Sequence, residues 1–160
     1  SRGLEVRVFW PEIYIFQYWS MRIKGSYLVE WRVKTKFDND LDLAQYKMGI
    51  ILAQAYDSCV VQAREQKFVG NFTNNWEEAL FLNQGLISIK SSRGLPTLIL
   101  KEGSQDSIFV QVHNTPANLS TRMINFCRFG EDIVDDHSVK VLRVRRGDIW
   151  ENKVDLKIKS

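Results

Sequence analysis

Cysteine and histidine, the usual partners in nucleophilic catalysis, are scarce in this sequence, with two of each among 160 residues. Cys127 together with a histidine would be the minimal nucleophile–base pair. However, the sequence predicts that Cys127 lies on the apolar stripe of a helix, where a free cysteine usually behaves as a small buried side chain. Cys59 and Cys127 form no CxxC motif, so we expect two buried thiols in a reducing compartment.

Acidic side chains and one histidine cluster between two predicted elements, at Glu131, Asp132, Asp135, Asp136 and His137. Such groups can bind metal ions or transfer protons. Active sites usually gather these groups from several elements, so one continuous segment favours a solvated acidic loop. Phosphate-binding glycine motifs are also absent. We therefore expect a non-enzymatic domain without cofactor or metal, and leave metal- or acid-dependent activity open.

Alternation is strongest in residues 21–37, where apolar and charged side chains exchange places at every step. Val29, Trp31 and Val33 occupy odd positions, whereas Arg32 and Lys34 occupy even ones. Side chains on a strand point to opposite faces with period two. The segment is therefore predicted to be a strand with one apolar face and one cationic face.

Positive charge is concentrated at two places in the chain. Residues 20–37 carry five cations and one anion, and residues 138–160 carry seven cations and three anions. Residues 149–159 repeat the alternation of the first basic segment, with apolar side chains on one face. If the two strands are neighbours, their outward faces form one basic surface, and such asymmetry bears on binding partners rather than on fold.

A basic surface with nearby aromatic side chains is typical of proteins that bind single-stranded nucleic acid, where cations contact phosphates and bases stack on rings. We therefore predict binding of single-stranded DNA or RNA. The predicted phosphate contacts are Arg22, Lys24, Arg32, Lys34, Lys36, Lys153, Lys157 and Lys159, and the predicted stacking residues are Tyr18 and Trp19.

Residues 9–19, FWPEIYIFQYW, are more apolar than one sheet face requires. Exposed apolar surface of this kind marks protein-binding sites. The alternative function is therefore a protein-interaction subunit of a larger complex. Its partner would be another protein or a second copy of this chain.

Strands are predicted at residues 4–10, 12–19, 21–37, 58–63, 67–72, 86–90, 97–101, 107–113, 139–145 and 149–159. Apolar residues at helical spacing, preceded by a capping Asp40, predict a helix over 41–56. A short helix is predicted from Asn74 or Asn75 to residue 82, and a third helix follows Thr115-Pro116 and ends near Gly130.

This order of elements predicts an α+β fold in a single β-rich domain spanning residues 1–160. We expect a mainly antiparallel, curved sheet of about eight to ten strands with two main helices and one short helix. An OB-like barrel and paired units of four strands plus a helix both suit this order. No apolar run is long enough to span a bilayer, so we expect an intracellular protein, cytoplasmic or nuclear, without a membrane partner.

Overall fold

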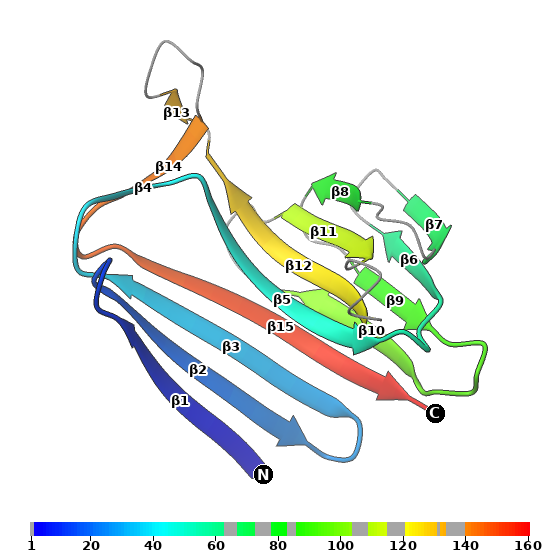
Figure 1. The fold of residues 1–160 in the computed structure, drawn as a ribbon. Helices are drawn as coiled ribbons and strands as arrows, with labels where there is room; N and C mark the ends of the chain where they lie inside the picture. The colour runs from blue at the N-terminus through cyan, green and yellow to red at the C-terminus, as the bar shows by residue number, and fades with distance from the viewer. Residues whose placement is uncertain are drawn as a thin grey trace.

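The computed structural model describes residues 2–62, 67–72, 78–82, 86–103, 109–114, 121–130, 132–133 and 140–160. These residues form fifteen strands and no helix (Figure 1). Every strand pair is antiparallel. The predicted α+β class is therefore wrong, and the fold is all-β.

The largest sheet has eight strands in the order β1-β2-β3-β15-β10-β9-β6-β7. Their bounds are β1 Arg2–Trp10, β2 Ile15–Lys24, β3 Leu28–Phe37, β15 Ile149–Lys159, β10 Thr97–Glu102, β9 Leu86–Lys90, β6 Ser58–Gln62 and β7 Lys67–Asn71. β1, β2, β3 and β15 are its longest strands and lie side by side in Figure 1.

A second sheet of four strands has the order β5-β12-β11-β8, and a small third sheet has the order β13-β14-β4. Their bounds are β5 Gln45–Ala53, β12 Thr121–Phe129, β11 Phe109–Asn114, β8 Glu78–Leu82, β13 Asp132–Ile133, β14 Lys140–Val144 and β4 Leu41–Leu43. One buried apolar cluster joins the two larger sheets, and it includes Val33 of β3, Met48 of β5, Leu100 of β10 and Phe126 of β12. The fold is therefore a β-sandwich.

The predicted phase of β3 is confirmed. Trp31, Val33 and Thr35 are buried, whereas Arg32 and Lys34 between them are exposed. β15 pairs directly with β3, so the two basic segments of the sequence are neighbours in one sheet.

The predicted helix over residues 41–56 is wrong, because β4, β5 and a turn occupy this segment. Tyr46, Met48 and Leu52 are buried at even positions, which is the period of a strand. Ile51, which a helical stripe requires on the buried side, is 64% exposed. Apolar residues at 41, 44, 48, 51, 52 and 55 fit a helix by spacing alone, and pairing with β12 decides the outcome.

The other two predicted helices are also wrong where the structure describes them. Residues 78–82 form β8, and residues 121–129 form β12; residues 74–77 and 115–120 lie outside the described part of the chain. β12 is buried on both faces from residue 124 to residue 128, so its apolar residues do not alternate as those of a half-buried strand do. Without helices, the paired strand-plus-helix arrangement is excluded for these residues, and two stacked open sheets replace the OB-like barrel. Nor does the described part of the chain contain a helix able to span a membrane.

Candidate functional site

The predicted phosphate-binding residues share the outward face of β2, β3 and β15. Arg32 lies opposite Lys153 in the register of β3 with β15, and Lys34 lies opposite Tyr18 in the register of β2 with β3. The structure therefore brings these cations onto one surface. Trp19 lies opposite Val33 and points to the inward face, so the two predicted stacking residues lie on opposite sides of the sheet.

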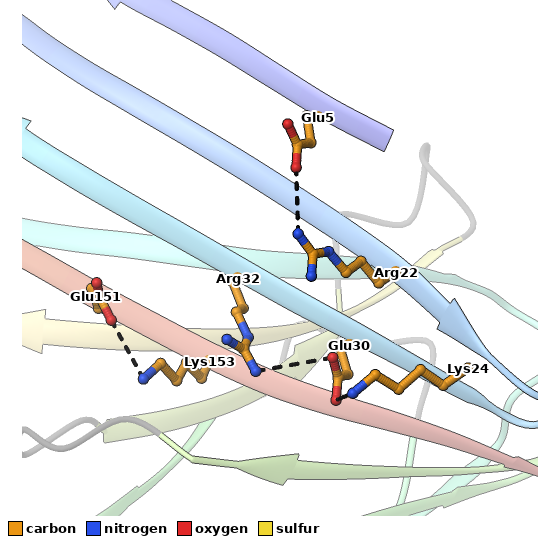
Figure 2. A network of polar contacts seen from close by, with 7 residues as sticks. All are labelled: Glu5, Arg22, Lys24, Glu30, Arg32, Glu151 and Lys153. Atoms are coloured by element: carbon orange, nitrogen blue, oxygen red, sulfur yellow. Dashed lines mark hydrogen bonds and ion pairs between the residues drawn. The ribbon is translucent and has the colours of Figure 1, made fainter. Parts of the chain in front are cut away.

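Carboxylates interleave with these cations (Figure 2). Glu30 contacts Lys24 at 2.6 Å and Arg32 at 3.9 Å. The hydrogen bond from Lys24 is the main cause that lowers the pKa of Glu30. Glu5 lies 3.6 Å from Arg22, and Glu151 lies 3.4 Å from Lys153. The outward face is thus a surface of mixed charge rather than a continuous cationic groove.

The inward face of β1 and β2 extends beyond the four-stranded sheet. In Figure 1, none of the described strands lies over β1 and β2. Leu4 is 59% exposed, and Val6, Met21 and Ile23 are exposed as well, although this face is buried core on β3. β5 is the edge strand of the four-stranded sheet. Beyond this edge, the apolar side chains of β1 and β2 are exposed to solvent.

Two indoles share one amide on this uncovered face. The Nε1 atoms of Trp10 and Trp19 both donate hydrogen bonds to Oε1 of Gln17, at 3.4 Å and 3.3 Å. Trp10 is 48% exposed and Trp19 is half-buried. Gln17 holds the polar edges of both rings, which leaves ring surface available to a ligand. We call Trp10, Gln17 and Trp19 the indole platform.

β1 and β2 position the platform through their hairpin. Val8 lies opposite Gln17 and Trp10 lies opposite Ile15, so Trp10 and Gln17 are diagonal neighbours on the inward face. Trp19, two residues after Gln17, points to the same face. On the far side Trp19 packs against Trp31 of β3, with ring centroids 5.7 Å apart. The sheet therefore fixes both indoles.

A buried polar network adjoins the platform. The phenol of Tyr46 bonds the Thr35 hydroxyl at 2.7 Å, and Thr35 lies opposite Gln17 in the register of β2 with β3. Burial raises the pKa of Tyr46, so this group stays a neutral phenol. Asn152 accepts a hydrogen bond from Nη2 of Arg128 at 3.4 Å. Gln17 therefore places the platform next to the polar interior of the sandwich.

These groups suit a neutral, polar ligand with an apolar face. Indole rings offer flat apolar surface, and amide and hydroxyl groups offer both donors and acceptors. In the described ranges, no group of three histidine, cysteine, aspartate or glutamate side chains is placed to hold a metal ion. Asp132 is described only in its backbone, and the rest of the predicted acidic loop lies outside the described residues.

Away from the platform, a hollow of about 340 Å³ lies between β4 and β14. Its lining consists of Asp40, Leu41, Asp42, Arg143, Val144 and Arg145. Asp42 faces Arg143 at 3.8 Å, and Asp40 accepts a hydrogen bond from the backbone N–H of Arg146 at 2.7 Å. Asp42, Arg143 and Asp40 thus already have polar partners, which makes this hollow the weaker candidate for a ligand site.

No family model matches the chain, and no curated protein matches it in sequence. A solved structure from Escherichia coli K12, described as "Putative aldose 1-epimerase", is similar in fold, with a TM-score of 0.62 and 8% sequence identity. The match covers 98% of this chain and 64% of that chain, so this chain spans less than two thirds of the neighbour's length. The likeness shows the fold.

The nucleic-acid prediction is wrong. The fold is a β-sandwich that is similar to the structure of the Escherichia coli protein. The interleaved carboxylates on the outward face give the physical reason, because they compete with phosphates for the same cations. Of the platform residues, Trp19 was predicted from the sequence as a stacking residue, Trp10 was included only within the apolar run 9–19, and Gln17 was missed. The sequence feature that could have indicated Gln17 is a single amide residue in phase with Ile15 and Trp19 within an apolar run.

Proposed function

We propose that this chain is a carbohydrate-binding β-sandwich, which holds a sugar ring against the indole platform. The observation that carries the proposal is the pair of hydrogen bonds from Trp10 and Trp19 to Gln17 on an uncovered sheet face. An exposed tryptophan whose polar edge already has a partner offers its ring face to a ligand.

The chemistry of a sugar matches this surface. A pyranose has an apolar face of C–H groups and a rim of hydroxyls. The apolar face packs on an indole, and the sugar hydroxyls form hydrogen bonds with amide or hydroxyl side chains. Binding sites commonly combine an aromatic wall with a few polar groups of this type. Gln17 lies between the two rings, and because its side-chain oxygen already accepts from both indoles, it is the side-chain N–H groups that would donate to a sugar hydroxyl.

The similar fold gives independent support. The name of the Escherichia coli protein describes an enzyme that acts on an aldose, and its chain contains a sandwich of this kind. At 8% identity, no residue role is transferred from it. The support is limited to the compatibility of this architecture with a sugar ligand.

We infer binding rather than turnover. Epimerisation at a sugar carbon requires groups that take and give protons near the operating pH. The described hydrogen bonds of the platform join indole and amide groups, and the pKa of the nearby Tyr46 phenol is raised by burial. A neutral phenol in the interior serves poorly as a general base.

Saturation-transfer NMR with a panel of aldoses and their methyl glycosides tests this proposal. We expect at least one sugar to receive saturation, and Trp10→Ala and Trp19→Ala each to abolish it. Tyr27→Ala is the matched control, because Tyr27 is an exposed aromatic residue outside the platform, in the turn after β2. Saturation that persists in both tryptophan variants, or that no sugar receives, would overturn the proposal. Release of the opposite anomer at a rate above the spontaneous one would overturn the inference of binding alone.

A further inference from the structure

β1 is the edge strand of the eight-stranded sheet. It pairs with β2 along nine residues, and none of the described strands pairs with its other side. All its residues are exposed except Val8, which is half-buried. The backbone N–H and C=O groups along that free side are therefore accessible to another strand.

β1 lacks most of the features that keep edge strands unpaired. Proteins commonly protect an edge with lysine, proline, a bulge or a short strand. Between Arg2 and Trp10 there is neither lysine nor proline, and the register with β2 is unbroken. Its inward face carries Leu4, Val6, Val8 and Trp10. Such a strand is suited to pairing with an apolar strand of similar length.

We propose that β1 pairs antiparallel with β1 of a second copy, so that Val6 lies opposite Val6 of the partner subunit. The two-fold axis is then perpendicular to the sheet, and each residue faces a residue on the same side of the sheet. Glu5 lies opposite the partner subunit's Arg7, and Arg7 lies opposite the partner subunit's Glu5. Leu4 lies opposite the partner subunit's Val8 in the same way.

Charge selects this register over its neighbours. A pairing centred on residue 5 places Glu5 opposite Glu5 of the partner subunit. A pairing centred on residue 7 places Arg7 opposite Arg7 of the partner subunit. Like charges directly opposite each other destabilise a strand pair, and opposite charges stabilise it. Of these three registers, only the one centred on Val6 pairs Glu5 with Arg7 of the partner subunit, and the two-fold symmetry forms this pair twice.

The present contacts of these two residues leave them available. Glu5 contacts Arg22 at 3.6 Å with both side chains largely exposed, and Arg7 lies over the Tyr18 ring at 5.9 Å. In the pair, Glu5 lies between two guanidinium groups. The outward face gains a further match, because Phe9, stacked on Phe16, lies opposite the partner subunit's Gly3. An aromatic ring can cover the space that a glycine leaves on the facing strand.

Pairing would also extend the uncovered face. The apolar side chains of both β1 strands become one continuous surface, with an indole platform near each end. Trp10 then lies opposite the partner subunit's Arg2, which places a cation beside the exposed indole. The inference goes beyond the proposed sugar binding, since its test needs no sugar.

Charge-swap variants measured by sedimentation equilibrium test the pairing and its register. We expect the wild-type chain to dimerise, and Glu5→Arg and Arg7→Glu each to weaken dimerisation at least about tenfold. A mixture of the two variants restores a heterodimer, because each Arg then faces a Glu. A monomeric wild type, or a mixture no stronger than its components, would overturn the proposal. Circular dichroism melts confirm that each variant is folded.

Cysteine pairs test the register by a second route. Cys59 and Cys127 are buried, so an introduced cysteine on β1 is the reactive thiol among the described cysteines. Glu5→Cys mixed with Arg7→Cys is expected to form the mixed disulfide in excess over either symmetric one, since facing residues have the separation that a disulfide requires. Statistical mixing of the three products would overturn the register.

Discussion

The phenolic oxygen of Tyr46 on β5 lies 2.7 Å from the hydroxyl oxygen of Thr35 on β3, so a buried hydrogen bond joins the two larger sheets. Tyr46→Phe leaves the Thr35 hydroxyl, which is fully buried, without this partner. We expect the free energy of unfolding to fall by about 1–3 kcal/mol. Chemical denaturation measures the change.

Thr35→Val provides the other side of a double-mutant cycle for this pair. We expect the double variant to lower the free energy of unfolding by less than the sum of the two single variants. Strict additivity would show that the two hydroxyls do not stabilise the fold through each other.

Gly49→Ala is expected to destabilise the sandwich by about 1–3 kcal/mol, through overpacking. Gly49 lies opposite Asn125 in the pairing of β5 with β12, and a Cβ there would collide with the Asn125 side-chain oxygen. Thermal unfolding measures the loss. Gly103→Ala is the matched control, because its nearest neighbours would lie at 3.9 Å, an ordinary contact. Equal melting temperatures for the two variants would contradict the packing at Gly49.

Asp57 makes the stability of the fold depend on pH in the acid range. The hydroxyl of Ser92 and its backbone N–H, the latter at 2.8 Å, donate to the Asp57 carboxylate and lower its pKa below the ordinary 3.8. A group with a lowered folded pKa stabilises the protein fully above its unfolded pKa, and this contribution is lost as pH falls through the folded pKa.

We therefore expect wild type to melt above Asp57→Asn at neutral pH, and the difference to shrink as pH falls below about 4. Melting temperatures recorded across the acid range provide the measurement. A difference that stays constant with pH would mean that the charge of Asp57 does not act on stability.

Burial raises the pKa of the Cys59 thiol to about 11. The thiolate is the reactive form, so Cys59 should resist a thiol reagent at mildly alkaline pH while the protein is folded. Cys127 is buried as well. Both should react at once in denaturant, which is the control. Rapid labelling of the native protein would show that the interior beside β6 opens readily.

The sequence was sufficient where a strand is buried on one face only. β3 and β15 have core on one side and solvent on the other, so Val33 and Lys34 alternate as their environments do. β5 misled because Ala44, Ile51 and Ala55 complete a helical spacing by coincidence, and Ile51 is exposed. β12 misled because both its faces are buried, which removes alternation.

The candidate site was only partly predictable for a related reason. The aromatic run 9–19 contains Trp10 and Trp19, but the function was predicted from the basic outward face instead. The role of Gln17 depends on the register of β1 with β2, which places it diagonal to Trp10. The extent of the uncovered face depends on where β5 ends the second sheet. Neither the β1–β2 register nor the position of β5 at the edge of its sheet can be read from the local periodicity of the sequence.

The most direct test of sugar binding follows the indole N–H resonances of the five tryptophans during titration with the best sugar of the panel. We expect the resonances of Trp10 and Trp19, assigned through Trp10→Phe and Trp19→Phe, to shift with a common affinity. Trp150, which packs against Phe37 and Tyr46 inside the sandwich, should not move. Shifts confined to other tryptophans, or no shift with any sugar of the panel, would contradict a carbohydrate site at the indole platform.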